Sequence, residues 1–417
     1  MKTETKNSLL IINQYASTPK YSSGAGERFY YLAPYFNAAG YKVSVVSGSY
    51  NHLFIRSPKT DQLFTEEEIP GGIFYWLRLK NYRGENFIGR LYSWFEFLYK
   101  LFFFKLEEPP HIVIVSSMSL FPIIYGYYLK MRYSSKLILE VRDIWPLTPM
   151  ELGGYSKNHP FIALMRQIEK FAYKKSDTLV SVLPGFGNHV KEVIKIYKEV
   201  TWIPNGISAT LQKEQDTSGE LNLLDSAYFN VVYTGAIGIA NALEYLIEAA
   251  GILNAHPHIR ISIIGEGPEK NALEAKVKSN SLTNIRFLPK IEKNLVVHIL
   301  NQSDVCLISW RNKRIYTFGV SANKYNDYML ARKPILSASA ILSDPVVVAN
   351  CGLQVEPENA EAMAKGILQL YHKSDIERDK LGENGKQYVL KHKTYEVLSL
   401  KYLTLFDQLI NKSISPR

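Results

Sequence analysis

Short apolar runs alternate with amphipathic stretches along the chain, and most of the first half follows this pattern. Continuous apolar runs separated by segments with helical spacing are typical of a parallel sheet that is covered by helices on both faces. The strands predicted for the first half are Leu9–Asn13, Lys42–Ser47, Gly72–Leu77, Ile112–Ser116, Lys136–Val141 and Thr178–Val182.

The same alternation restarts after a polar, loop-like stretch at residues 208–225. The strands predicted there are Phe229–Tyr233, Arg260–Ile264, Ile285–Phe287, Val305–Ile308, Pro334–Leu336 and Gly352–Val355. The fold class predicted is therefore α/β, with two Rossmann-like, doubly wound parallel-sheet domains that face a cleft, because such sheets bind ligands beyond the C-terminal ends of their strands.

The length of 417 residues is enough for two domains with full cores. With the junction near Pro204-Asn205-Gly206, we expect an N-terminal domain at 1–205 and a second domain at 206–393. The segment 394–417 is expected to form a C-terminal helix that packs back on the body.

The net charge of +10 lies mostly in the first 200 residues. A basic surface suits nucleic acid, acidic lipid or phosphorylated ligands, or serves only solubility. No nucleic-acid-binding motif accompanies the charge, so we expect no nucleic-acid partner. Cys306 and Cys351 have no metal-type spacing, which excludes a disulfide framework and fits a reducing compartment. The apolar run after the polar N-terminus is too short for a signal peptide, and we expect a cytoplasmic protein.

The aromatic block at 87–104 is interrupted by Arg90, Glu96 and Lys100. A bilayer crossing needs about 20 predominantly apolar residues, so we expect no membrane-spanning helix. Aromatic and aliphatic residues with Arg and Lys at intervals suit a helix that lies in a membrane interface, and they equally suit a core helix of a large domain.

Two places in the first half carry candidate chemistry. Gly24 and Gly26 follow the first strand and precede a helical pattern, where backbone N–H groups favour anions, although a tight turn without a ligand has the same pattern. The turn lacks the third glycine of a dinucleotide fingerprint, which argues against an oxidoreductase. Arg142 and Asp143 end a buried strand just before Trp145; Asp143 could orient a hydroxyl or act as a base, or the two could form a structural pair.

The second half repeats the glycine turns. Gly235 and Gly238 follow its first strand, and Glu266 lies in another strand-to-helix turn. Lys324 and Asp327 are spaced i, i+3 near the start of a predicted helix at 323–330, so they share a face. This spacing is compatible with a solvated charge pair. It is equally compatible with a binding site in which Ser321 and Lys324 hold a diphosphate while Asp327 accepts hydrogen bonds from a sugar.

Five motifs in order resemble the family-4 retaining glycosyltransferases of GT-B fold, in particular their WbuB-like bacterial surface-polysaccharide subgroup. The motifs are VRDIWP (141–146), IPNGI (203–207), YTGAIG (233–238), GEGP (265–268) and GVSANKYNDYMLARKPIL (319–336). The similarity runs over nearly the whole chain. It implies a nucleotide diphosphate sugar as donor, no cofactor and no metal.

The resemblance also implies roles for single residues. In the wider family two glutamates eight positions apart contact the donor; here these positions are Gly319 and Asp327, so the first carboxylate is absent. The turn at 235–240 lacks the basic pair that many members use for the diphosphate, which makes Lys324 and then Arg142 the candidates for that charge. The residues assigned as catalytic are Asp143, Arg142 and Lys324, and those assigned to the donor are Gly24, Gly26, Gly235, Gly238, Glu266, Ser321, Asn323, Lys324 and Asp327.

The function expected from this resemblance is transfer of a hexosyl or N-acetylhexosaminyl group, with retention at the anomeric carbon, to a polyprenyl-diphosphate-linked saccharide at the inner membrane. The product would be an O-antigen, a capsule or an exopolysaccharide. Two alternatives share the fold: a nucleotide-sugar 2-epimerase, and a relative that binds a nucleotide sugar without catalysis.

Overall fold

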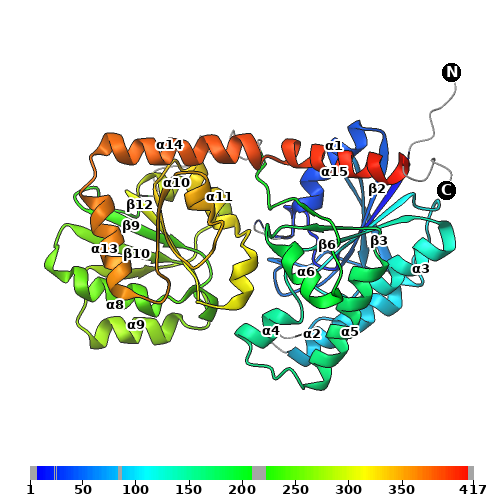
Figure 1. The fold of residues 1–417 in the computed structure, drawn as a ribbon, viewed down its shortest axis with the longest axis horizontal. Helices are drawn as coiled ribbons and strands as arrows, with labels where there is room; N and C mark the ends of the chain where they lie inside the picture. Colours follow the sequence, from blue (N-terminus) through cyan, green and yellow to red (C-terminus); the bar gives the residue numbers. More distant parts are fainter. Residues whose placement is uncertain (1–6, 23, 25, 83–86, 209–221, 412–417) are drawn as a thin grey trace. The chain divides into compact units, whose positions relative to one another are not determined.

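The computed structural model describes residues 7–22, 24, 26–82, 87–208 and 222–411, and it divides the chain into two compact units (Figure 1). The first unit comprises Met1–Pro204 and Tyr395–Arg417, and the second comprises Asn205–Thr394. Most of the predicted loop at 208–225, together with Ser23 and Ala25 of the first glycine turn, lies outside the described residues.

The first unit is built on an eight-stranded sheet with the order β3-β4-β2-β1-β5-β6-β7-β8. All neighbouring strands are parallel except β3 and β4, which form an antiparallel pair. The strands are β1 (Asn7–Ile12), β2 (Tyr41–Gly48), β3 (Phe64–Ile69), β4 (Gly72–Leu77), β5 (Ile112–Ser116), β6 (Lys136–Val141), β7 (Thr178–Ser181) and β8 (Val200–Trp202).

Helices cover both faces of this sheet. The helices of the unit are α1 (Arg28–Ala38), α2 (Phe87–Leu101), α3 (Ile123–Tyr133), α4 (Leu147–Leu152), α5 (Pro160–Lys175), α6 (Phe186–Ile194) and α15 (Tyr395–Asn411). On one face α1 and α15 pack beside each other (Figure 1). On the other face α3 contacts β5 and β6, where Gly126 leaves no room for a side chain: a Cβ there would lie 2.6 Å from a methyl group of Val115.

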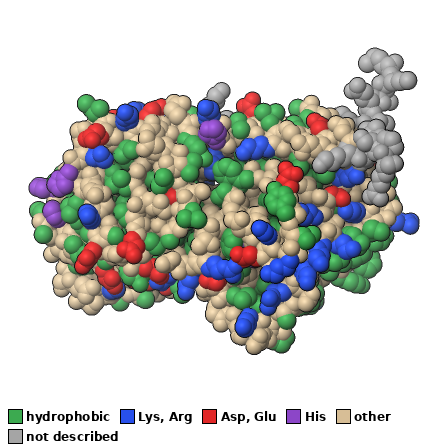
Figure 2. All heavy atoms as spheres, in the orientation of Figure 1, with side chains coloured by type: hydrophobic (Ala, Val, Ile, Leu, Met, Phe, Trp, Pro, Cys, Tyr) green, Lys and Arg blue, Asp and Glu red, His purple; other side chains and the backbone are tan. Residues whose placement is uncertain are grey.

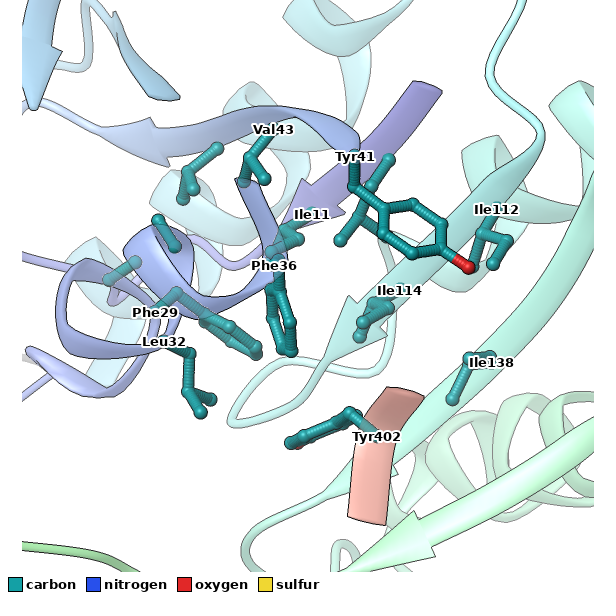
Figure 3. Close-up of a cluster of buried hydrophobic side chains, with 14 of the residues drawn as sticks. Ile11, Phe29, Leu32, Phe36, Tyr41, Val43, Ile112, Ile114, Ile138 and Tyr402 are labelled. Carbon is teal, nitrogen blue, oxygen red and sulfur yellow. The ribbon is translucent and has the colours of Figure 1, made fainter. Parts of the chain in front are cut away.

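The last helix completes the core of the first unit. The ring of Phe36, on α1, meets that of Tyr402, on α15, with centroids 5.5 Å apart, and Figure 3 shows Tyr402 in one cluster with the strand residues Ile114 and Ile138. Phe406 packs against the rings of both Phe36 and Tyr41. Within the segment 394–417, where a C-terminal helix was expected, the structure has α15 at Tyr395–Asn411, whose side chains belong to the core of the first unit; residues 412–417 lie outside the described residues.

A buried polar network fastens the same helix. Arg28, at the start of α1, donates to the carbonyl oxygens of Ile203 and Pro204 at 2.8 and 2.6 Å and to the Tyr402 hydroxyl at 3.1 Å. Its Nε lies 3.3 Å from the carboxylate of Glu140, which also accepts from Tyr402. Both charged side chains are almost completely buried. The segment Ile203–Pro204 and helix α15 are therefore joined to α1 and β6 through an ion pair that is shielded from water.

The second unit contains a six-stranded, fully parallel sheet with the order β11-β10-β9-β12-β13-β14. The strands are β9 (Phe229–Thr234), β10 (Ile259–Ile264), β11 (Ile285–Leu288), β12 (Val305–Ser309), β13 (Ile335–Ala338) and β14 (Gly352–Val355). Buried side chains from α8 (Glu244–Ile252), α9 (Lys270–Ser279) and α13 (Ala360–Tyr371) form a core on one face. The core on the other face includes α10 (Val296–Asn301), α11 (Asn323–Leu330), α12 (Pro345–Val348) and α14 (Asp375–His392).

Each sheet has one place where the direction of strand addition reverses. In the first unit it lies between β1 and β5, and in the second between β9 and β12. Connections from the two neighbouring strands diverge there, so the C-terminal ends of the strands leave a crevice in which open α/β sheets bind ligands. The loops after β1 and β9 and the start of α11 are therefore where functional side chains are expected.

All twelve predicted strands are present, with ends shifted by at most two residues, and the sequence missed β3 and β8. Strand β3 reads FTEEEI, without an apolar run, because it is the edge strand and most of its residues are partly exposed. Strand β8 has three residues and lies at the other edge. Both predicted parallel sheets are present, and the first has one antiparallel pair, β3–β4, at its edge.

Candidate active site

Lys324 lies in the first turn of α11 and turns toward the end of β9. Its ammonium nitrogen Nζ donates to the Tyr233 hydroxyl at 2.8 Å and to Oδ1 of Asn241 at 3.2 Å. It also lies 4.2 Å from the centre of the Tyr233 ring, within the range of a cation–π interaction. The structure thus brings Lys324 together with the turn that contains Gly235 and Gly238, 80 to 90 residues away in the sequence.

The Lys324 ammonium is poorly compensated for a buried cation. Within the parts of the chain that the structure describes, no carboxylate forms an ion pair with it. Desolvation lowers the pKa of Lys324 to about 7, and the charge of Asp327 one turn away offsets only part of this effect. A bound diphosphate would supply the missing negative charge and favour the protonated amine.

Gly235 makes the approach of this lysine possible. Its φ is +133°, a region that L side chains rarely adopt, and a Cβ built on it would lie 3.2 Å from Lys324 Nζ. The space beside Gly238 is open, and its φ of −138° is ordinary. Of the two predicted glycines, Gly235 is therefore the one whose lack of a side chain positions the cation.

Replacing Gly235 with alanine is expected to weaken binding of a nucleoside diphosphate about tenfold, because the new methyl group pushes the ammonium away and strains the backbone. Isothermal titration calorimetry with the nucleoside diphosphate measures the change. Gly251→Ala on α8 is the matched control, since its Cβ would meet only an ordinary contact at 3.8 Å. Equal losses in both variants would contradict this role of Gly235.

The start of α8 is less suited to an anion than the turn before it. A 3-10 turn at Ile239–Asn241 separates the glycine turn from α8, which begins at Glu244. Glu244 lies in the first turn of α8 and pairs with Arg311, so a carboxylate already occupies the positive end of that helix. The first turn of α11 has no acidic residue. The anion site is therefore centred on α11 and Lys324.

The second glycine turn, GEGP, supports the first through the backbone. A Cβ on Gly265 would lie 1.9 Å from the carbonyl oxygen of Gly235, and one on Gly267 would lie 2.1 Å from that of Ile237. The backbone N–H of Ile237 donates to the carbonyl of Glu266 at 2.9 Å. The Glu266 carboxylate pairs with Lys270 at 2.6 Å and is more than half exposed. Close packing of two turns thus explains these glycines without a ligand.

Asp327 has a partner that the sequence did not indicate. Both of its carboxylate oxygens accept from Lys293 Nζ at 2.5 Å, and Lys293 lies 34 residues earlier in a short 3-10 turn. The pair is partly exposed, so Asp327 keeps lone pairs that can accept from a ligand hydroxyl. Lys293 stands in no motif; only the folded chain shows that it adds a second cation beside α11.

Ser321 and Asn326 hold the segment where the second unit begins. The Ser321 hydroxyl accepts from the backbone N–H of Asn205 at 2.8 Å, and its carbonyl accepts from the Asn205 side chain at 2.6 Å. Asn326 donates to the Asn205 carbonyl at 3.2 Å. The hydroxyl assigned to a diphosphate therefore fastens Asn205 of the IPNGI motif, while Asn323, the first residue of α11, is exposed.

Gly319 shows why the first carboxylate is missing. Its φ is +95°, at the end of the 3-10 turn Arg314–Phe318, and glycine tolerates this conformation far better than glutamate does. A glutamate here would require a different path for the backbone before α11. The glycine at position 319, in place of the family's first glutamate, therefore fits the local backbone conformation of this loop.

In the first unit, Asp143 organises the end of β6. Its carboxylate accepts from Trp145 Nε1 at 3.0 Å and from the Thr148 hydroxyl at 2.6 Å, and burial raises its pKa. Arg142 is oriented separately: its backbone N–H donates to the Ser117 hydroxyl, and burial lowers the pKa of its guanidinium. The structure shows Asp143 bonded to its own loop and not to Arg142.

The glycine turn after β1 is satisfied internally. The N–H of Gly24 donates to the Glu27 carboxylate at 2.8 Å, and the Ser22 hydroxyl donates to the same oxygen at 2.7 Å. Gly26 has a φ of +84°, and a Cβ there would lie 2.3 Å from the Tyr15 carbonyl. Both glycines therefore have a structural explanation, because a carboxylate of the chain already lies where an anionic ligand was expected.

Outside the gaps at 1–6, 23, 25, 83–86, 209–221 and 412–417, no three or more His, Cys, Asp and Glu side chains are grouped so that they could hold a metal ion. Over the same ranges, none of the helices has the length and apolar content needed to cross a bilayer.

The chain matches two sequence families, one in each half. Residues 22–211 match the family described as Glycosyltransferase Family 4, and residues 228–373 match the family described as Glycosyl transferases group 1. A curated relative, the putative colanic acid biosynthesis glycosyl transferase WcaI of Escherichia coli K12, is 25% identical over 250 residues, which cover 56% of this chain and 60% of WcaI. The match thus spans about three fifths of that relative.

Solved structures share the whole fold at low sequence identity. Sucrose-phosphate synthase from Thermosynechococcus elongatus has a TM-score of 0.75 at 17% identity, with 97% of this chain and 100% of that chain covered. An α,α-trehalose-phosphate synthase (UDP-forming) from Burkholderia vietnamiensis has a TM-score of 0.74 at 12% identity, with 99% of each chain covered. These likenesses confirm the predicted architecture of two parallel-sheet α/β domains.

Proposed function

Because this chain belongs to the family-4 glycosyltransferases of GT-B fold, we propose that it transfers a sugar, with retention at the anomeric carbon, from a nucleotide diphosphate sugar to a saccharide acceptor. The acceptor is a polyprenyl-diphosphate-linked saccharide, and the product is a bacterial surface polysaccharide. The similarity to WcaI supports a role in polysaccharide synthesis. The proposal needs no metal and no cofactor.

The observation that carries the donor half of this proposal is the position of Lys324. A lysine that is partly deprived of water and has no ion-pair partner among the described residues lies at the reversal point of the second sheet, in the first turn of α11. A departing nucleoside diphosphate develops negative charge, and a preorganised cation and helix N-terminus stabilise that charge in the transition state. Asp327 would then accept from a hydroxyl group of the donor.

An exposed apolar surface on the first unit supports the lipid-linked acceptor. It consists of side chains of α2, the turn after it and α3: Ile88, Tyr92, Phe95, Tyr99, Phe102, Phe103, Tyr128 and Met131, each at least 44% exposed. We call these residues the apolar surface. The rings of Phe102 and Tyr128 are 5.6 Å apart, so the α2 and α3 parts are continuous. The opposite face of α2, which includes Trp94 and Phe97, is buried, so α2 fits neither a fully buried core helix nor a solvated one.

Cations accompany this surface. Lys80 lies over the Tyr92 ring at 5.7 Å, and Lys105 and Arg132, both exposed, follow Phe103 and Met131 closely in the sequence. In Figure 2, blue Lys and Arg side chains gather over the first unit at the lower right, beside green hydrophobic ones. Aromatic side chains bordered by cations suit the surface of an anionic bilayer, and we propose peripheral binding to the cytoplasmic face of the inner membrane.

The double replacement of Tyr99 and Met131 by serine is expected to weaken binding to phosphatidylglycerol-containing vesicles roughly tenfold, because two exposed apolar side chains no longer enter the interface. Cosedimentation with vesicles measures the change. Leu342 and Ile376 in the second unit are even more exposed than Tyr99 and Met131, and their replacement by serine is the control. Equal binding of the Tyr99/Met131 variant and the unmodified protein would contradict the membrane proposal.

A panel of nucleotide sugars tests the whole proposal. The protein is incubated with each donor, with and without a lipid-linked saccharide, and nucleoside diphosphate release is followed. Acceptor-dependent release together with a product whose anomeric proton coupling matches that of the donor supports retaining transfer. Conversion of the nucleotide sugar into its epimer without an acceptor, or tight binding without turnover, would replace the proposal with one of the two alternatives.

A further inference from the structure

Unpartnered polar atoms gather in the loops at the C-terminal edge of the first sheet. Gln14 Oε1 follows β1, Asn51 Nδ2 and His52 Nδ1 follow β2, and Arg90 Nε lies on α2, after β4. Each of these atoms is buried and has no hydrogen-bond partner among the described residues. Gln14 and Asn51 are 3% and 2% exposed, so neither side chain can compensate by turning to bulk water.

Contacts with α2 bring these residues to one place. Gln14 Nε2 donates to the hydroxyl of Ser93 at 3.0 Å, and the Trp94 indole donates to the hydroxyl of Tyr15 at 2.8 Å. The ring of Tyr15 meets that of His52 edge-on, with centroids 6.0 Å apart. The loops after β1 and β2 therefore converge on the inner face of α2, one turn after Arg90.

Arg90 is close enough to act on this cluster. Its positive charge, together with burial as the larger cause, lowers the pKa of His52 to about 4. The Nε atom of Arg90 is buried while the residue as a whole is partly exposed, and in the described part of the chain no carboxylate pairs with it, whereas the buried Arg28 is paired with Glu140. His52 is consequently neutral at pH 7, and the cluster has one uncompensated positive charge.

Such an arrangement is costly unless something binds to it. A buried polar atom without a partner loses its hydrogen bonds to water and gains none in return, and native proteins tolerate few of them. Asn51 Nδ2 and Arg90 Nε are donors, which suit anionic oxygen atoms, and Gln14 Oε1 is an acceptor, which suits a hydroxyl. The free groups thus match a ligand that contains both a phosphate and a sugar.

The other side of α2 indicates where this ligand comes from. Ile88 and Tyr92, two positions before and after Arg90, are 76% and 52% exposed and belong to the apolar surface. An anion bound to Arg90 would therefore lie across α2 from that surface, one helix diameter (~10 Å) away. A molecule with an apolar tail, a diphosphate and a saccharide, in this order, would place its tail on the apolar surface, its diphosphate at Arg90 and its saccharide at the polar cluster.

We propose that Arg90 and Asn51 bind the diphosphate of the lipid-linked acceptor, and that Gln14 and His52 contact the first sugar attached to it. This inference rests on the proposed function, since it assigns the acceptor of that reaction to a place in the first unit. Arg90 is a binding residue here. It carries no step of the chemistry, which takes place at the donor.

The test uses farnesyl diphosphate as a probe in phosphatidylcholine vesicles, with the full chain and no donor. We expect a saturable shift of the His52 ring proton in the NMR spectrum, identified by its loss in His52→Gln. Arg90→Gln is expected to weaken the response at least about tenfold, and Arg90→Lys to restore part of it. Arg166→Gln, which removes an exposed charge on α5 that has no assigned role, is expected to respond like the unmodified protein.

Three results would overturn the inference: no shift in the unmodified protein, an unchanged response in Arg90→Gln, or the same shift from phosphatidylglycerol vesicles without farnesyl diphosphate. The last would identify a site for lipid headgroups in general. The probe experiment needs no turnover, so its outcome is separate from that of the nucleotide-sugar panel. Binding through Arg90 without sugar transfer would refute the proposed function alone, and transfer without such binding would refute this inference alone.

Discussion

Replacing Lys324 with alanine is expected to lower the turnover of the nucleotide sugar by roughly 100-fold to 1,000-fold, the loss typical of removing one preorganised group that stabilises developing charge. The ammonium group lies at the start of α11 with only Tyr233 and Asn241 as hydrogen-bond partners. Steady-state rates of nucleoside diphosphate release, with donor and acceptor varied in turn, measure the effect. Lys276→Ala is the control, because Lys276 forms a partly exposed pair with Glu248 on the same unit.

The pH dependence distinguishes a charged role from a structural one. Since the pKa of Lys324 is about 7 in the free protein, affinity for a nucleoside diphosphate should fall as the pH rises above 7, by up to about tenfold per pH unit. The alanine variant should lose this dependence. The effect of pH on folding stability has the opposite sign. Between pH 7 and about 10.5 the Lys324 amine is protonated in the unfolded chain and neutral in the folded one, so the free energy of unfolding increases as the pH rises. Near-normal turnover in Lys324→Ala would contradict the assignment of Lys324 to the diphosphate.

The largest effect on stability is expected for Arg28→Met. The change leaves the Glu140 carboxylate buried without its cation and removes the donors to Ile203 and Pro204. Breaking a buried pair from one side costs about 3–5 kcal/mol of unfolding free energy. Urea unfolding followed by tryptophan fluorescence reports mainly on the first unit, since all tryptophans except Trp310 lie there.

A double-mutant cycle shows whether the pair itself is responsible. Arg28→Met combined with Glu140→Gln should cost less than the sum of the two single changes, because no uncompensated charge remains. Arg132→Met on the surface of α3 is expected to change stability by no more than about 0.5 kcal/mol. If Arg28→Met costs as little as Arg132→Met, the buried network does not have the role assigned to it.

Much of the fold could be predicted because buried parallel strands leave a strong local signal. Strand β14 and helix α11 were predicted with the ends that the structure has, and α15 begins one residue after the start of the segment 394–417 in which a helix was expected. Pro334, the last residue before β13, was taken as its first. The edge strand β3 was not predicted, because its three consecutive glutamates are typical of a solvated loop. Local sequence patterns thus predict the strands and helices that are buried in a core and miss the strands at the edges of a sheet.

The site was predictable only in part, for a reason that particular residues show. Lys324 and the turn at Gly235 each stand in a motif, yet nothing in the sequence says that the amine reaches Tyr233. Lys293 belongs to no motif, and its partner Asp327 lies 34 residues away in the sequence. Arg90 belongs to no motif either. The comparisons confirm the glycosyltransferase family and the fold class, while the assignments of single residues and the WbuB-like subgroup stay predictions.

The place of α15 in the first unit has a consequence for the order of folding. A chain emerging from the ribosome presents β1 to β8 first, then the whole second unit, and α15 last. Until α15 arrives, Phe36 and Tyr41 lack their covering rings, and Arg28 and Glu140 lack Tyr402. The second unit can therefore mature before the first one closes, which reverses the usual order in which domains fold during synthesis.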